Sequence, residues 1–157
     1  LAGALALAAA IALMLRMRHW QTRHILDAPI IWVLHLGHAW VPVAFACKAA
    51  ADLAGWLPAD AALHAFTIGA IGTSILAVMT RAALGHTGRP LHAPKSIVAA
   101  YLLVTGAALV RIFGPVATDD LLIWVIVPAA MWIAAFGLFT VVFAPILTRP
   151  RPDGKPG

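Results

Sequence analysis

The chain has 157 residues, of which 62% are hydrophobic and only 11% are charged, and its formal net charge is +5 at pH 7. A soluble domain carries about 25% charged residues, so this composition excludes an ordinary soluble protein and indicates a chain that lies mainly in lipid. The basic residues stand in short connectors between apolar segments. That pattern is a signal of membrane topology and gives no support to nucleic-acid binding.

Successive apolar segments predict an all-α fold, a polytopic transmembrane helical bundle of about five spans. In chain order the predicted spans are residues 1–15, 30–53, 61–84, 96–113 and 121–147, and a Pro- and Arg-rich tail of residues 148–157 follows. We expect the tail to be disordered. Turns are expected at Trp56, Pro58 and Asp60, and again at Gly114, Pro115, Asp119 and Asp120.

The first segment is short for a membrane span. Fifteen residues rise about 22 Å as a helix, whereas the hydrocarbon core is about 30 Å thick. The segment also lacks the basic lead-in of a signal peptide. We therefore expect the chain to begin inside a span and to be a fragment of a larger protein, its C-terminal portion.

The basic residues alternate between the two sides of the predicted bundle. Nine lie on one side, namely Arg16, Arg18, Arg23, Arg81, Arg89, Lys95, Arg149, Arg151 and Lys155, and two on the other, Lys48 and Arg111. The positive-inside rule places the side with nine in the cytoplasm. The segment is thus expected to start outside, with its C-terminus and tail cytoplasmic.

Seven histidines are an unusual number for so apolar a chain, because titratable side chains are costly within a bilayer and usually face the bundle interior there. His19 and His24 lie among arginines in the first connector, where a solvated loop is expected. His35 and His38 are three residues apart in the second span and share a helix face. Two imidazoles on one buried face suit copper, iron or zinc. A hydrogen-bonded pair packed against a neighbouring helix explains them equally well.

The third span carries a small-residue face of Ala65, Gly69 and Thr73, on which another helix or a flat macrocycle can approach the backbone closely. His64 opens this span near the predicted outer face. Arg81 lies near its other end, where it can snorkel to the interface or pair with an anion such as a haem propionate.

His86 follows the third span, in the turn Gly-His-Thr-Gly-Arg-Pro at residues 85–90. The span separates His64 from His86 by about 30 Å at helical rise, so these two residues cannot bind one metal. His35, His38 and His86 belong to the cytoplasmic half, whereas His64 belongs to the outer half. No P-loop, HExxH or CxxC motif is present, and no acidic residue stands in mid-span, which weakens a proton-coupled transporter interpretation.

Two stretches give the chain a family resemblance. Residues 63–90, with Leu-His-Ala-Phe-Thr-Ile-Gly-Ala-Ile-Gly-Thr, Met-Thr-Arg and Leu-Gly-His-Thr-Gly-Arg-Pro, resemble the most recognisable motif of the NnrS family. The segment Trp-Val-Leu-His-Leu-Gly-His-Ala-Trp at residues 32–40 is similar to the corresponding helix of that family.

The resemblance implies a bacterial inner-membrane protein of about twelve spans that contains haem and copper and takes part in nitric oxide metabolism and protection from nitrosative stress. It implies His35, His38, His64 and His86 as candidate haem or copper ligands, and the position of Arg81 adds it as a candidate cofactor-binding residue. The expected partners are the lipid bilayer, nitric oxide or a related small molecule, and the remaining N-terminal spans, with no nucleic acid. Whether the protein is an enzyme stays open. The alternatives are a channel or transporter with structural histidines, or a cytochrome-type electron-transfer subunit.

Overall fold

The structure is a computed structural model that describes residues 1–118 and 120–154, and within these ranges it contains helices and turns but no strand. The elements in chain order are α1 (Ala2–Met17), the 3₁₀ turn η1 (Thr22–Ile25), α2 (Pro29–Ala49), η2 (Ala50–Ala54), α3 (Ala61–His64), η3 (Ala65–Gly72), α4 (Thr73–His86), α5 (Lys95–Ala117) and α6 (Ile123–Thr148). η2 and η3 are π-helical and continue the α-helices beside them without a break.

Four continuous helices are long and apolar enough to cross a membrane: Pro29–Ala54, Ala61–His86, Lys95–Ala117 and Ile123–Thr148. The fifth, α1, is a shorter apolar helix of 16 residues. The prediction of an all-α membrane bundle is therefore confirmed. The turn predicted at Gly114 and Pro115 is wrong, because α5 continues through both residues to Ala117. Asp119, expected in the same turn, lies outside the described residues.

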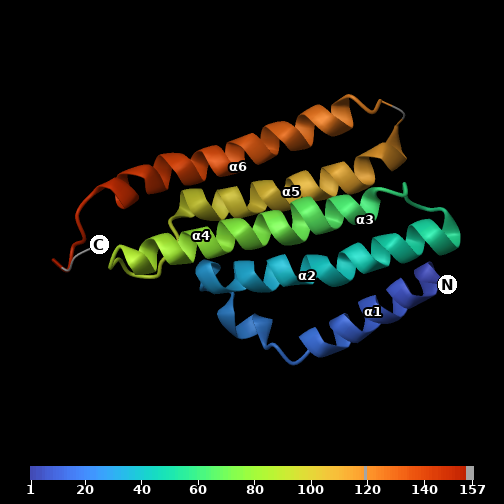
Figure 1. Ribbon diagram of the computed structural model, residues 1–157, viewed down its shortest axis with the longest axis horizontal. Coiled ribbons are helices and arrows are strands. Elements are labelled where there is room, and N and C mark those ends of the chain that lie inside the picture. The colour runs from blue at the N-terminus through green and yellow to red at the C-terminus, as the bar shows by residue number, and fades with distance from the viewer. Residues whose placement is uncertain (119, 155–157) are drawn as a thin grey trace.

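The helices run up and down in sequence order (Figure 1). α1 packs on α2, α2 packs on the α3–η3–α4 helix, and α5 packs on both that helix and α6. One core cluster joins α2, α4, α5 and α6 around Tyr101, Leu76 and Phe143. A second joins α2, α3, η3 and α5 around Trp40 and Ile112. α2 and α4 therefore share a long buried contact, which positions the histidines described below.

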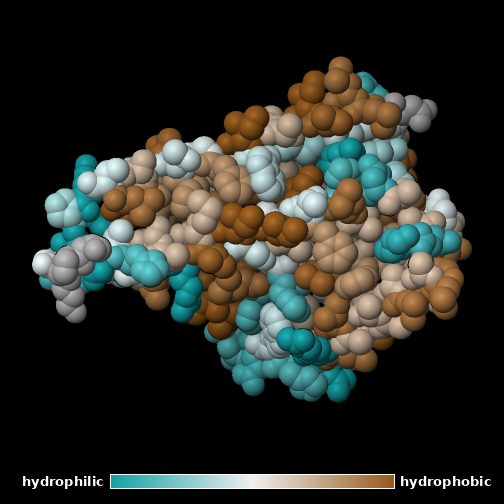
Figure 2. All heavy atoms as spheres, in the orientation of Figure 1, coloured by the Kyte–Doolittle hydropathy of each residue, from teal (hydrophilic) through white to brown (hydrophobic). Residues whose placement is uncertain are grey.

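The connectors at residues 18–28 and 87–94 and residues 149–154 lie at one end of the bundle, toward the left in Figure 1. We call this the basic end and the other the opposite end. Figure 2 shows apolar side chains over much of the helix flanks, and hydrophilic ones at the basic end, over the first connector and at the opposite end. Only 17% of an apolar 18-residue stretch of α6 is buried within the bundle. This helix therefore exposes most of its surface to lipid or to further helices.

Candidate metal and cofactor site

A groove runs along the face that α2 and α4 share toward the basic end. It consists of two adjoining cavities of about 500 Å³ and 520 Å³, which have Leu34 and Val78 as common walls. The first cavity is lined by His35 and His38, and the second by Arg81 and His86. Four of the five residues predicted from the sequence therefore line one continuous groove.

The two histidines of α2 are covered by the first connector. The Trp20 ring centroid lies 4.8 Å from that of His35 and 4.6 Å from that of His38. Thr22 Oγ1 is hydrogen-bonded to His35 Nδ1 at 2.9 Å. His38 Nε2 is buried and has no hydrogen-bond partner among the described residues. Leaving such a group unsatisfied costs about 1–3 kcal/mol, so His38 is the position in this cavity where a ligand is expected.

A close helix contact places the histidine pair beside α4. A Cβ added at Gly37 would lie 2.6 Å from Ser74 Oγ and 3.3 Å from the Ser74 backbone nitrogen. Glycine at this position therefore allows α2 and α4 to approach closely between His35 and His38. The small-residue face predicted on the third span is also filled by helix packing, because the Trp40 indole lies directly on Gly69. That face has no room for a macrocycle.

The second cavity is as open as the first and differs from it in carrying a charged side chain, Arg81. Both Arg81 and His86 are exposed, and no described acidic side chain lies within ion-pair distance of Arg81. The open wall and the unpaired guanidinium would accept a larger, anionic group.

The tail fixes the turn that follows His86. Arg151 Nη1 donates to the His86 carbonyl at 2.8 Å, and the same guanidinium donates to the Asp153 carboxylate from Nε at 2.9 Å and from Nη2 at 2.6 Å. These bonds to Asp153 raise the pKa of Arg151 above its usual value. The tail is predicted to be disordered, and in its described part Arg151 contacts the helix end.

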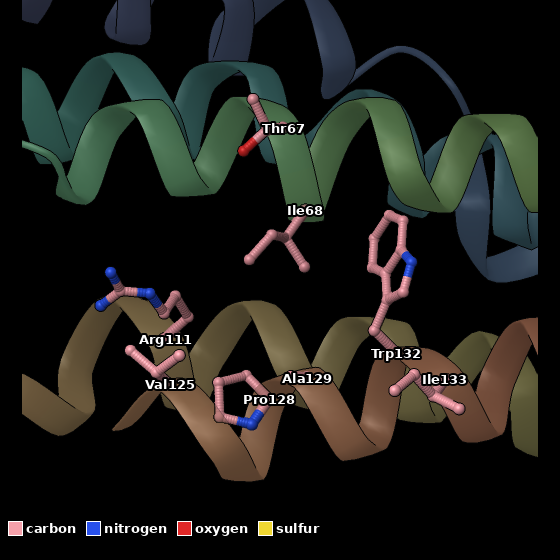
Figure 3. A pocket seen from close by; sticks show the side chains of 8 residues that line it. All are labelled: Thr67, Ile68, Arg111, Val125, Pro128, Ala129, Trp132 and Ile133. Atoms are coloured by element: carbon pink, nitrogen blue, oxygen red, sulfur yellow. The ribbon is translucent and has the colours of Figure 1, made fainter. Parts of the chain in front are cut away.

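His64 lies apart from the groove, at the opposite end. Its Nε2 is 3.0 Å from Asp60 Oδ2, and the same oxygen is 3.7 Å from Arg111 Nη2. The spacing of four residues between Asp60 and His64 makes this contact a local one within a helical turn. Beside it, a cavity of about 420 Å³ opens between η3, α5 and α6. Figure 3 shows Arg111 and Thr67 at this cavity among mostly apolar side chains, and His64 does not line it.

The part of the chain that the structure describes contains no group of three or more His, Cys, Asp and Glu side chains able to hold a metal ion. A closed site of four protein ligands, as structural zinc requires, is therefore not formed by these residues. The imidazole pair at His35 and His38 remains as a nitrogen donor set, and such donors suit copper and haem iron.

A comparison with known protein families shows which family the chain belongs to. The model of a family described as NnrS protein matches residues 1–151. The chain belongs to the NnrS family. No curated protein and no solved structure gives a significant match. The match covers α1 to α6 and the groove with all its histidines, so every candidate ligand discussed above lies within the NnrS-matched region, and the chain is a multi-pass membrane protein of that family.

Sequence reasoning missed two residues of this site. Trp20 and Thr22 both lie in the first connector, where a solvated loop is expected. Both instead contact the histidines of α2 across a loop. No periodicity in the sequence indicates this contact, since the connector folds back by tertiary packing.

Proposed function

We propose that the protein binds haem and copper in the bacterial inner membrane and takes part in nitric oxide metabolism or protection from nitrosative stress. Membership in the NnrS family supports this role at the level of the family. The observation that carries it in this chain is the groove, because His35, His38, Arg81 and His86 line it together and His38 Nε2 is buried with no partner in the described part of the chain.

The residues of the groove suit these cofactors by their chemistry. His35 and His38 offer neutral imidazole nitrogens, and His86 offers a third in the adjoining cavity. Arg81, without an acidic partner in the described chain, would hold an anionic group such as a propionate. When bound, haem iron supplies a binding site for nitric oxide and copper supplies a one-electron centre. The chain itself supplies ligands, burial and charge balance.

The orientation is part of the proposal. The connectors rich in arginine lie at the basic end, and the positive-inside rule puts such connectors in the cytoplasm. The groove would then open on the cytoplasmic half of the membrane, with His64 and Arg111 in the outer half.

The test is an absorption spectrum with iron and copper analysis on the native protein purified from membranes. We expect a haem Soret band and copper in the wild type, and loss of one or both in the variants His35→Ala, His38→Ala and His86→Ala. His24→Ala is the matched control, because His24 is exposed and lines none of the cavities described above. A native protein with neither iron nor copper would refute the proposal and favour a channel or transporter. Loss of metal only in His64→Ala would move the site to the opposite end.

A further inference from the structure

We propose that the cavity of about 420 Å³ between η3, α5 and α6 binds an aminophospholipid, a lipid with a phosphate and a free ammonium such as phosphatidylethanolamine. In this arrangement the phosphate lies on Arg111, the ammonium on Asp60, and an acyl chain in the cavity. The site is at the opposite end from the histidine groove, and the inference does not depend on haem or copper.

Arg111 is the residue in this cavity that needs a ligand. Its side chain is only 20% exposed, and its ion-pair contact within the described chain is a long one, 3.7 Å from Nη2 to Asp60 Oδ2. The guanidinium has five N–H donors, and none of them makes a hydrogen bond to a described residue. A charged group so largely removed from water is costly when it is poorly paired. A phosphate is a strong acceptor for a guanidinium, often through two parallel hydrogen bonds.

The carboxylate beside Arg111 determines which headgroup fits. Asp60 Oδ2 is the oxygen that faces both Arg111 and His64, whereas Oδ1 has no partner among the described residues. This carboxylate would repel a headgroup with only negative charge. In ethanolamine the ammonium is joined to the phosphate through two methylene groups, so it can reach Oδ1 while the phosphate lies on Arg111. A choline headgroup has no N–H to donate to Asp60. The two opposite charges therefore favour a zwitterionic headgroup with a free ammonium.

The cavity itself suits an acyl chain. Figure 3 shows Arg111 and Val125 at one end of it, and Trp132 and Ile133 at the other, with mostly apolar side chains between them. The Trp132 ring lies directly on Gly72 and closes the end away from Arg111. Val125 and Ile133 are both exposed, so a chain can enter along the flank of α6 from the lipid. A basic side chain beside an apolar cavity between membrane helices is a typical phospholipid site.

The experiment is native mass spectrometry of the protein purified from membranes, stripped of lipid and titrated with phosphatidylethanolamine, phosphatidylglycerol or phosphatidylcholine of identical chains. We expect phosphatidylethanolamine to bind about tenfold more tightly than either of the other two, as one additional charge-assisted hydrogen bond predicts. A wild-type protein that binds phosphatidylglycerol or phosphatidylcholine equally tightly or more tightly would overturn the proposal. This comparison does not depend on the folding of any variant.

Two substitutions separate the two parts of the headgroup. Arg111→Gln should weaken phosphatidylethanolamine binding about tenfold. Lys48→Gln is the matched control, because it removes a positive charge from an exposed side chain on the same side of the bundle, and it should leave binding unchanged. Asp60→Asn should bring phosphatidylethanolamine and phosphatidylcholine to nearly equal affinity. Unchanged binding in Arg111→Gln, or an unchanged preference in Asp60→Asn, would show that the headgroup assignment is wrong.

A bulky side chain tests the place of the acyl chain. Ala129→Trp fills the cavity and should weaken phosphatidylethanolamine binding about tenfold or more. Ala130→Trp is the control, because Ala130 is exposed on the same helix and does not line the cavity. Equal binding by the two variants would overturn the role of the cavity. Haem and copper are measured on the same samples. A native protein without either metal would refute the proposed function and leave the lipid site standing, whereas the loss of lipid preference alone would refute only the lipid site.

Discussion

The contact between Gly69 and Trp40 allows the packing of η3 against α2 to be tested with a single substitution. A Cβ at Gly69 would lie 2.7 Å from both Cε3 and Cγ of Trp40, and nearer still to Cδ2. Carbon atoms pack at about 3.5–4.0 Å, so Gly69→Ala forces the two groups apart by about 1 Å. Trp40 is only 5% exposed and belongs to the core between α2, η3 and α5.

The cost of this substitution follows from overpacking, for which about 1–3 kcal/mol is typical. The Trp40 indole borders a cavity of about 340 Å³ between α2 and α5, into which it can retreat in part. Alanine also gains about 1 kcal/mol over glycine inside a helix. We therefore expect Gly69→Ala to destabilise the protein by up to about 2 kcal/mol, the overpacking cost less the gain in helix preference. Since Trp40 stands two residues after His38, the same shift should also reduce copper retention.

Gly137→Ala is the matched control, because no neighbouring atom lies within 4 Å of a Cβ at Gly137 in α6. There the helix preference acts alone, and a gain of up to about 1 kcal/mol is expected. The assay is the apparent melting temperature by circular dichroism in detergent micelles, with copper content measured on the same samples. The reasoning is refuted if Gly69→Ala melts at or above the temperature of Gly137→Ala.

Three further predictions follow from single contacts. Thr22→Val removes the hydrogen bond to His35 and should weaken metal binding at this histidine about tenfold or more, measured as a lower iron or copper content of the purified protein; wild-type contents of both metals would show that Thr22 does not orient the ring. Arg151→Gln removes the bond to the His86 carbonyl and should speed amide hydrogen exchange at residues 86–90, while the melting temperature changes little, as for most surface substitutions; unchanged exchange would show that the tail does not hold the turn. Asp60→Asn removes the carboxylate beside His64 and Arg111, but Asp60 is 51% exposed, so both metals should be retained at wild-type content; loss of either would place a cofactor at the opposite end.

The sequence was sufficient for the helices because their length and apolar composition are local properties. Residues 61–84 predict a span on hydropathy alone, and the observed helix runs from Ala61 to His86. The ends are less predictable. Gly114 and Pro115 are typical of a turn, yet α5 continues to Ala117. Trp124 packs against Gly114, and this contact from the next helix is invisible to a local pattern.

The sequence predicts how far along the helices the candidate ligands lie, but it does not predict which helix faces meet. Counting residues put His35, His38 and His86 in the same half of the bundle. Whether their helix faces meet depends on how α2 and α4 rotate against each other. The contact of Gly37 with Ser74 sets that rotation. The contacts of Trp20 and Thr22 depend on a connector that returns over a helix, a tertiary arrangement that no sequence period encodes.

The hydrogen bonds of polar side chains within the spans differ between the threonines and the two histidines of α2. Most threonine hydroxyls in the spans form a hydrogen bond within their own helix, although Thr73 Oγ1 is buried with no partner among the described residues. Thr67, Thr80, Thr105, Thr140 and Thr148 each donate to the carbonyl four residues earlier. Among the histidines, His64 also has a local partner, the Asp60 carboxylate four residues earlier, whereas the two histidines of α2 do not. His35 takes its partner from a residue 13 positions away, and His38 has none among the described residues. Because unsatisfied polar groups are costly in a low-dielectric interior, His38 is the position on this helix face where a bound ligand would remove that cost.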